Sequence, residues 1–479
     1  MTIEIPIVIK KGTKSLNEEF TFHVPDNVHS IAILLQTEQS MWLTYMVYDE
    51  QKELRAQYQK GNSPDTIVIH QNKSKTSPYT IYGSLPSGEW TIDFAISTNE
   101  VLASTHQVAT VTIQYNEEQE LIPDKVFWQD KGRPSFQLND FDSQKIYQPK
   151  SKWYKGDLHT HTIHSDGAMT REENMISAKK QNLDFFVATD HNIVPTSWHE
   201  KQDILVIPGV EVSAPRGDFN ILATNTSPFS SNPLEDMETD EGMNRIIQSE
   251  YGNAIISINH PFLTEWKWLY TETPLDQIDA IEICNDPTYP DNEKATEMAL
   301  VAWNVLLNDG YRITGVGGSD CHKKPTETYE GSKLPSLIGD PGTFVYCDGL
   351  SADQVVKGLK QGNVVISREA FIQFSIDDFI PGNQCNVKEG TAKALVNSDA
   401  SIYFEWVVDG EMVKKEHGNQ SEYTFNFSDE NYHWIRVDVR YIDGSFYGFS
   451  NPIFFGNKKP TLTKWGQLLN ITKGKFLND

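Results

Sequence analysis

Between residues 153 and 367 the chain alternates short apolar runs with segments of helical periodicity, and this alternation restricts the possible folds more than any other sequence feature. The apolar runs are strand candidates at 185–189, 205–210, 254–258, 280–283 and 313–316. Apolar spacing typical of amphipathic helices predicts helices over 171–182, 243–251, 293–308 and 352–362. Strands that alternate with helices form parallel sheets, and this number of strands favours a closed (β/α) barrel.

The regions on either side of this central segment have a different pattern of apolar and polar residues. Residues 1–115 consist of short alternating runs broken by turn residues, which predicts an N-terminal antiparallel β-sandwich. Residues 116–150 show no sustained period, so we expect a linker laid over a surface, followed by the barrel domain over 151–370. Alternation returns over 371–457, which predicts an immunoglobulin-like β-sandwich, and the basic tail 458–479 favours a short helix.

Charge and hydropathy exclude several classes of partner. The chain has 66 acidic and 41 basic residues, and its net charge of −25 repels phosphate backbones and anionic membranes. No run approaches the ~18 apolar residues that a membrane helix requires. The N-terminal stretch alternates like a strand and carries its positive charge after the apolar residues, unlike a secretory signal. We therefore expect a soluble cytoplasmic protein with no membrane partner and no bulk nucleic-acid partner.

Side chains of metal-ligand type follow the ends of the candidate strands. His159 and His161 precede the first expected helix, and Asp320 and His322 follow the last apolar run. Because side chains alternate along a strand, the two members of each pair share one face. The other strand ends carry Asp190, His191, Glu211 and His260. Imidazoles mixed with carboxylates suit Zn, Mn or Fe better than Ca or Mg, so the sequence predicts a transition-metal site at one end of the barrel.

The same residues carry a resemblance to a known family. The chain resembles the polymerase and histidinol phosphatase (PHP) superfamily in five motifs that occur in order over about 215 residues: Gly156-Asp-Leu-His-Thr-His-Thr162 with Ser165-Asp-Gly167, Thr189-Asp-His-Asn192, Gly209-Val-Glu-Val-Ser213, Asn259-His-Pro261 and Gly318-Ser-Asp-Cys-His322. The residues preceding the first motif, the N-terminal sandwich and the closing Ser450-Asn-Pro-Ile453 are similar to the CehA/McbA-like metallohydrolase branch.

The resemblance implies a distorted seven-stranded (β/α) PHP barrel that holds two or three divalent transition metal ions. It implies a first position held by His159, His161, Glu211 and Asp320. Glu211 would bridge to a second position bound by His260, and the third would be held by Asp166, His191 and His322. Relatives usually supply a further His to the second position, where this chain offers Asn285, Glu282 or Cys284. Relatives also often carry His where this chain has Asp218, a difference that we expect to concern substrate contacts.

The motifs also distinguish the PHP interpretation from another metal-dependent barrel, and they leave two histidines outside the expected site. An HxH pair on a first strand is also found in amidohydrolases, but those enzymes place a bridging Lys or carboxylate on a middle strand and a lone Asp on the last. Here Glu211 follows the third candidate strand and the last motif is Asp-x-His, which favours the PHP interpretation. His164 and His199 lie outside the pattern, and we expect both to be surface or loop residues.

The expected activity is hydrolysis by a metal-bound water, because no GxSxG elbow or Ser/His/Asp order supplies a protein nucleophile. A phosphoesterase that acts on a small anionic ester is the first interpretation. Arg368 and Arg216 are the candidate substrate-binding residues, with Lys323 and Lys324 as further basic candidates. A carbamate or carboxyl ester hydrolase with the same metal centre is the second interpretation. A non-catalytic binding protein that uses its sandwich domains is the third.

Overall fold

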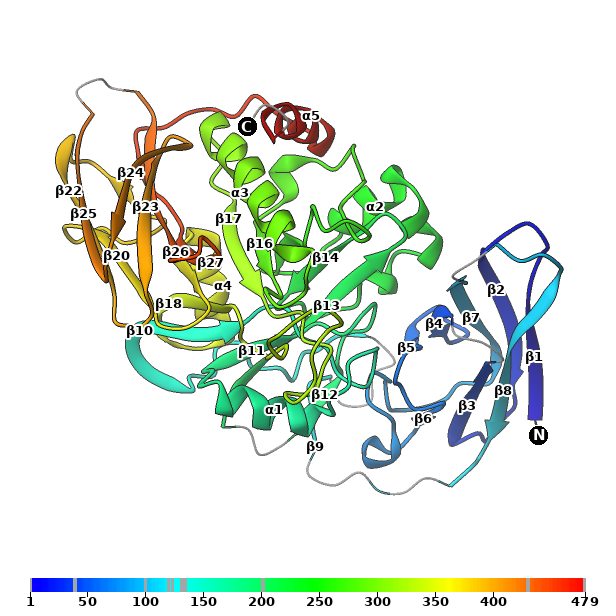
Figure 1. The fold of residues 1–479 in the computed structure, drawn as a ribbon. Coiled ribbons are helices and arrows are strands. Elements are labelled where there is room, and N and C mark those ends of the chain that lie inside the picture. Colours follow the sequence, from blue (N-terminus) through cyan, green and yellow to red (C-terminus); the bar gives the residue numbers. More distant parts are fainter. Residues whose placement is uncertain are drawn as a thin grey trace.

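The computed structural model describes residues 2–37, 41–98, 101–118, 121, 125–129, 136–199, 203–427 and 431–476. The chain forms a β-rich multidomain α/β protein. An N-terminal pair of sheets lies on one side of a central α/β unit, and a C-terminal β unit lies on the other side (Figure 1). Along the chain, β units thus precede and follow an α/β region.

The N-terminal unit contains two four-stranded antiparallel sheets. The first has the order β1 (Thr2–Ile9), β8 (His106–Tyr115), β3 (Ser30–Thr37) and β6 (Thr66–His70). The second has the order β2 (Ser15–Val24), β7 (Gly88–Ser97), β4 (Trp42–Tyr48) and β5 (Leu54–Gln59), and the short helix η1 spans Lys73–Lys75. Strand β1 alternates buried and exposed residues, as a strand with one solvated face should. Every residue of β5 is buried, because its outer side chains face the central unit.

The central unit is built on one large mixed sheet. Its strands follow the order β17 (Thr314–Gly318), β16 (Ala280–Asn285), β15 (Ile255–Ile258), β14 (Gly217–Leu222), β13 (Leu205–Ala214), β11 (Phe185–Ala188), β10 (Gln148–Asp157), β18 (Gly342–Leu350) and β19 (Val364–Ser367). The helices around it are α1 (Arg171–Lys180), α2 (Asp240–Ile247), α3 (Asn292–Asp309) and α4 (Ala352–Gln361), with η2 (Pro228–Ser230), η3 (Leu234–Glu238) and η4 (Leu275–Gln277). All four α-helices overlap the helical segments expected from the sequence. Among the described residues, no helix has the length and apolar character needed to span a membrane.

The expectation of a parallel sheet throughout is wrong at β14. This strand pairs antiparallel with both β13 and β15, and Pro215 and Arg216 form the tight connection that folds the chain back from β13. Gly217 makes the turn possible with a φ of 124°, a conformation that residues with a Cβ rarely adopt. Strands β18 and β19 are also antiparallel to their neighbours. The parallel pairs that remain are β10–β11–β13 and β15–β16–β17.

Strand β17 is joined to the far end of this sheet by hydrogen bonds from side chains and not by backbone pairing between strands. The Thr343 hydroxyl donates to the Gly317 carbonyl at 2.6 Å and accepts from its N–H at 3.3 Å. Asn451 accepts from the Gly315 N–H at 2.9 Å and donates to the Gly315 carbonyl at 2.7 Å, so its amide takes the place of a neighbouring strand. The sheet itself continues from β19 into the C-terminal unit through β27.

The C-terminal unit shares this large sheet. Its strands continue through β27 (Phe446–Ser450), β26 (His433–Tyr441), β23 (Ile402–Val408) and β24 (Glu411–His417), with β28 (Ile453–Phe455) and β21 (Gln384–Cys385) beside them. A three-stranded sheet of β20 (Ile372–Ile376), β22 (Glu389–Val396) and β25 (Gln420–Asn426) forms the other layer. The tail folds as α5 (Trp465–Phe476), which packs on α3 and buries Trp465 completely.

The segment expected to be a surface linker is partly a core element. Strand β9 (Lys125–Phe127) pairs with β12 (Ser197–His199), and the Trp128 ring stacks on that of Trp198 at 6.3 Å. Trp128, Phe136 and Leu138 are almost completely buried in the central core. Their irregular spacing gave no period from which this burial could be predicted. Residues 131–134 of the expected linker lie outside the described residues.

We expect Asn451→Ala to lower the free energy of unfolding by about 2–4 kcal/mol, because it leaves the N–H and carbonyl of Gly315 buried without partners. Urea unfolding followed by tryptophan fluorescence measures the change. Asn426→Ala is a matched control, because this exposed amide bonds only to Glu389 among the contacts of the structure and should change stability by about 0.5 kcal/mol or less. Equal effects of the two substitutions would contradict the role of Asn451.

Candidate metal centre

Eight of the expected ligand residues lie at one end of the central sheet. His159 and His161 follow β10, His191 follows β11, and His260 follows β15. The others are Asp166, Glu211, Asp320 and His322. Two of these residues have left-handed backbone conformations, with φ of 26° at His260 and 47° at Asp320. Hydrogen bonds hold both, since the His260 N–H donates to Glu282 and the Asp320 N–H donates to the His159 carbonyl.

The first group consists of the four residues His159, His161, Glu211 and Asp320, whose potential ligand atoms lie within 4.8 Å of one another. Asp320 Oδ1 lies 3.3 Å from His159 Nε2 and 2.9 Å from His161 Nε2. Glu211 Oε1 lies 3.1 Å from His159 Nε2, and Glu211 Oε2 lies 3.4 Å from His161 Nε2. The two imidazoles therefore face the same two carboxylates, although both lie beyond the end of β10.

A second group lies beside the first and contains His161, Asp166, His191 and His322. Asp166 Oδ1 lies 3.2 Å from His191 Nε2 and 3.1 Å from His322 Nε2. The His161 ring stacks on the rings of both His191 and His322, at centroid distances of 4.3 Å and 4.2 Å, and these two rings lie 5.7 Å from each other. Glu211 Oε2 also lies 2.9 Å from His191 Nδ1, so this carboxylate links the two groups.

A third group contains Glu211, Asp218 and His260, and it includes a residue that the sequence analysis placed elsewhere. His260 Nε2 lies 3.4 Å from Glu211 Oε1 and 3.9 Å from Asp218 Oδ2. Asp218 was expected to contact substrate, but it is buried and faces the ligand cluster. The antiparallel register of Ser213 with Asp218 brings it there, and recognition of the β13–β14 hairpin in the sequence would have revealed it.

Asn285 does not occupy the position expected for an additional ligand, whereas Glu282 belongs to a fourth candidate group, with His159 and His260. The Asn285 amide nitrogen donates to Glu282 at 3.1 Å and to Asp320 at 3.3 Å, while its oxygen accepts from Asn292. An amide N–H₂ group cannot bind a cation, so this arrangement argues against Asn285 as a ligand. Glu282 accepts from the backbone of His260 and lies 3.1 Å from His159 Nδ1, where it orients the ring. Cys284 is buried, and burial raises the pKa of its thiol.

The four basic residues proposed for substrate binding all have other contacts. Arg368 forms a two-point ion pair with Asp340, at 2.9 Å and 3.0 Å. Arg216 donates to Asp240 and to the Leu269 carbonyl, both at 2.7 Å, and it lies over the Tyr270 ring. Lys323 lies over the ring of Tyr329, and Lys324 lies 3.6 Å from Glu173. Both guanidinium groups are thus engaged with protein groups, and substrate binding by Arg368 and Arg216 stays a prediction.

The histidines outside the motif differ from expectation in one case. His164 is partly buried, and its ring lies 5.0 Å from that of Tyr79. Burial, together with the charge of Arg171, lowers the pKa of His164 to about 3. It is therefore a loop residue that packs against Tyr79 and is only partly exposed to solvent. His199 is partly exposed at the end of β12, next to the fully buried Trp198.

Charge balance within the first two groups keeps the carboxylates of Asp320, Glu211 and Asp166 ionised, because their pKa values are lowered. Burial alone would lower the pKa of His159, but the carboxylates of Asp320 and Glu211 raise it well above its usual value. Burial would raise the pKa of Asp320, but His159 and His322 hold it far below its usual value. Burial, together with the charges of His322 and His191, lowers the pKa of His161 to about 4, so this imidazole is neutral at pH 7.

The cluster fits a group of bound cations. Several of its buried atoms have no hydrogen-bond partner among the described residues, namely His159 Nε2, His161 Nε2, Asp166 Oδ1, Glu211 Oε2 and Asp320 Oδ1. Buried polar atoms in folded proteins almost always have a partner. These atoms point toward one another from separate strand ends, and imidazole nitrogens with carboxylate oxygens form the ligand set of Zn, Mn or Fe. The residues present therefore fit divalent transition metals.

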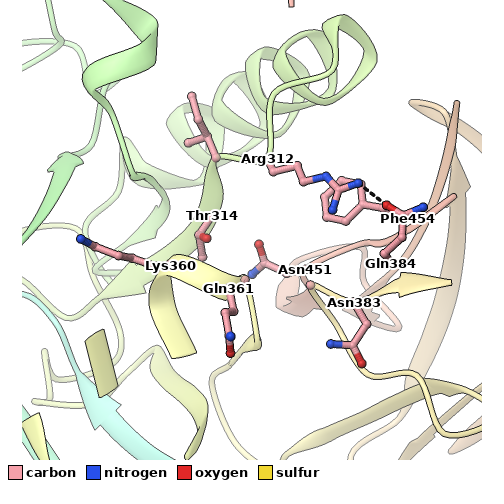
Figure 2. A pocket seen from close by; sticks show the side chains of 11 residues that line it. Arg312, Thr314, Lys360, Gln361, Asn383, Gln384, Asn451 and Phe454 are labelled. Carbon is pink, nitrogen blue, oxygen red and sulfur yellow. Dashed lines mark hydrogen bonds between the residues drawn. The ribbon is translucent and has the colours of Figure 1, made fainter. Parts of the chain in front are cut away.

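A cavity of about 340 Å³ lies at the opposite end of β17 from Asp320 (Figure 2). Arg312 and Lys360 supply its cationic side chains, but they point in opposite directions in Figure 2. Arg312 also donates to Gln384 and Asn457, and Lys360 donates to Asn253. The polar groups of this cavity therefore do not converge on one point, unlike those of the metal cluster.

Comparisons with known proteins add little to this geometry. No protein-family model matches the chain, and no curated protein matches it. One similar solved structure is a two-domain protein from Bacteroides vulgatus that contains a predicted PHP-like metal-dependent phosphoesterase, with 15% identity, a TM-score of 0.36, and coverage of 65% of this chain and 98% of that one. Another is a candidate metal-dependent phosphoesterase from Bifidobacterium adolescentis, with 14% identity, a TM-score of 0.26, and coverage of 44% and 96%. Both TM-scores lie below 0.5, so we infer function from the site's own residues.

The surroundings of Asp218 lead to a pH-dependent prediction. Burial and the charge of Glu211 raise the pKa of Asp218 to about 7. An unfolded Asp ionises near pH 4, so the wild-type protein without metal should lose stability as the pH rises from about 4 to about 7. Asn at this position stays neutral. We therefore expect Asp218→Asn to be more stable than the wild type at pH 8 in excess EDTA, with no difference at pH 4.

Urea unfolding at the two pH values measures this difference. The control is Asp276→Asn, which replaces an exposed carboxylate on η4 and should follow the wild type at both pH values. A wild type that is as stable as Asp218→Asn at pH 8 would show that the carboxyl ionises without cost.

Proposed function

We propose that the protein is a metal-dependent hydrolase of the PHP superfamily, in its CehA/McbA-like branch, and that its central sheet is a distorted form of the seven-stranded (β/α) barrel. The observation that carries the proposal is the convergence of unpartnered buried imidazole and carboxylate atoms from the ends of separate strands. The five sequence motifs that resemble this family contain the same residues. A structural cluster would pair these atoms with hydrogen-bond donors, whereas a metal centre leaves them free for cations.

Three of the four groups of side chains would correspond to three metal positions. His159, His161, Glu211 and Asp320 would hold the first, and Asp166, His191 and His322 would hold the third. Asp218 takes the place expected for Asn285 at the second position, together with Glu211 and His260. Glu211 takes part in both the first and the second position, and its contacts with four imidazoles suit a bridging carboxylate.

When bound, neighbouring divalent ions would supply Lewis-acid activation of water and of the scissile ester. The protein residues prepare the site for this chemistry. Glu282 fixes the His159 ring through Nδ1, so that Nε2 faces Glu211 and Asp320. Ser213 fixes His191 in the same way, through a hydrogen bond of 2.5 Å to Nδ1. No Ser or Cys nucleophile is assigned a role.

Phosphoester hydrolysis is the preferred activity, because several divalent cations at one site attract an anionic small-molecule ester. A specific observation favours a second candidate, which is hydrolysis of a neutral carbamate or carboxyl ester. Arg368 and Arg216 are both engaged in other contacts, so no guanidinium from the expected set is available to clamp a phosphate. The charge of the ions alone would then select the substrate.

We expect the purified protein to contain Zn, Mn or Fe, and we expect Glu211→Gln to lower hydrolysis and metal content together. The neutral amide of the Gln side chain cannot balance the charge of two cations. Even the loss of a residue that only contacts a metal ligand typically lowers metal affinity or activity about 10- to 100-fold. Elemental analysis and turnover of the preferred ester measure both effects. Glu235→Gln is the matched control, because this carboxylate is exposed on η3 and lies outside the cluster. A metal-free, inactive wild type that no added transition metal activates would contradict the proposal.

A panel of chromogenic phosphate, carbamate and carboxylate esters with the same leaving group separates the two candidate activities. We expect phosphate monoesters or diesters to give the highest kcat/KM. Faster turnover of carbamates or carboxyl esters would replace the phosphoesterase interpretation by the second candidate. Bound metal with no turnover of any ester would favour the non-catalytic binding protein.

A further inference from the structure

Two loops that carry candidate ligands make close contact with the N-terminal sandwich. The first loop is 164–167, which contains Asp166. The Asn62 N–H donates to the Ser165 carbonyl at 2.7 Å, and the Asn62 amide donates to the carbonyls of Asp166 and Gly167, both at 3.0 Å. The Ser63 hydroxyl donates to the His164 carbonyl at 2.8 Å. A turn of the N-terminal sandwich thus holds four successive carbonyl groups of this loop.

The residue before Asn62 is a glycine that this contact requires. A Cβ at Gly61 would lie 2.2 Å from the Ser165 carbonyl oxygen and 2.8 Å from the Asp166 Cα. Both atoms belong to the backbone, so neither can move aside without displacing the loop. The close approach of the two chains therefore depends on Gly61.

The second loop is 190–194, which contains His191, and three side chains of the sandwich hold it. The Tyr79 hydroxyl donates to Asp190 at 2.5 Å. The Gln57 amide accepts from the Val194 N–H at 3.1 Å and donates to the Val194 carbonyl at 2.9 Å. Thr44 accepts from the Asn192 amide at 3.2 Å. These contacts explain why β4 and β5 bury polar residues on the face toward the central unit.

The sandwich also contacts a ligand ring directly. Trp42 meets His191 edge to face at 5.0 Å, and His161 stacks on His191 at 4.3 Å. The His191 ring is therefore enclosed between a residue of the sandwich and a residue of the central unit. Among the described residues, no side chain of the sandwich forms a hydrogen bond with the side chains of His159, His161, Glu211 or Asp320.

We infer that the N-terminal sandwich is a working part of the metal centre, in which Asn62 and Gly61 position Asp166 and thereby set the affinity of the third metal position. This inference rests on the proposed function, since it requires a metal at Asp166, His191 and His322. Asn62 is a positioning residue, because it contacts only the backbone of the loop that carries the ligand. The first position should be independent of the sandwich.

The test is a titration of the full-length apoprotein with Zn²⁺ against a chromophoric chelator, which gives the number of bound ions and their separate affinities. Asp166→Ala identifies the ion that belongs to the third position. We expect Asn62→Ala to weaken the same ion by about tenfold or more and to leave the tightest ion unchanged. Visible spectra of the Co²⁺-loaded proteins report the same loss at one position.

Asn17→Ala is the matched control. Asn17 is also an exposed asparagine of the sandwich that donates across to the central unit, but it bonds to Glu238 on η3 and not to either ligand loop. It should bind Zn²⁺ like the wild type. Gly61→Ala should weaken the third ion more than Asn62→Ala does, while Gly474→Ala, whose added Cβ would lie more than 4 Å from the atoms considered among the described residues, should not. If Gly61→Ala fails to fold, Asn62→Ala and Asn17→Ala decide the question.

The outcomes separate this inference from the proposed function. A wild type that binds no Zn²⁺ or Co²⁺ would overturn both. A wild type that binds metal, with an Asn62→Ala variant of equal affinities, would overturn the inference and leave the proposed function intact. The inference also fails if all ions weaken together, if Asn17→Ala has the same effect, or if Asp166→Ala removes no ion.

Discussion

The structure depends on the carboxylate of Glu211, which is completely buried and lies within 3.4 Å of four imidazoles. An ionised carboxylate in a protein interior costs several kcal/mol unless opposite charges and hydrogen bonds compensate it. Asn259 donates to one oxygen at 2.8 Å, and the surrounding histidines hold the pKa of Glu211 well below its usual value. Divalent cations would provide a stronger compensation than protonated imidazoles, and the unpartnered Oε2 atom is placed to accept one.

The rest of the molecule brings ligands to this carboxylate and holds them there. Parallel pairing of β10, β11 and β13 places the residues that follow these strands at one edge, and β15, β16 and β17 do the same from the other side. Thr343 and Asn451 join the free edge of β17 to the sheet. The N-terminal unit contacts the loops of Asp166 and His191. Each unit thus has a contact that bears on the geometry of the centre.

Much of this arrangement follows from local patterns in the sequence. Apolar runs located β11, β13, β15, β16 and β17, because buried parallel strands have few polar residues. The rule that barrel sites lie at the carboxyl ends of strands then selected the ligand residues. Strand β14 was not predicted because Asp218 and Asn220 interrupt its apolar run, although both side chains are buried.

Other features depend on contacts between residues distant in the sequence. The sequence predicted Arg368 as a phosphate-binding residue, but it does not show that Arg368 pairs with Asp340. That pair depends on how β18 and β19 are joined to the rest of the sheet. The orientation of the Asn285 amide is set by Glu282 and Asn292 together. The burial of Trp128 requires Trp198 as its partner. Sequence periodicity contains none of this information.

Anomalous X-ray scattering from crystals of the purified protein, recorded at the Zn, Mn and Fe absorption edges, tests the central claim most directly. The account predicts a peak about 2.0–2.2 Å from the imidazole nitrogens of His159 and His161 and from carboxylate oxygens of Glu211 and Asp320. Crystals that bind a transition metal only elsewhere, or that show hydrogen-bonded water in place of any metal at this cluster after soaking in all three ions, would contradict it.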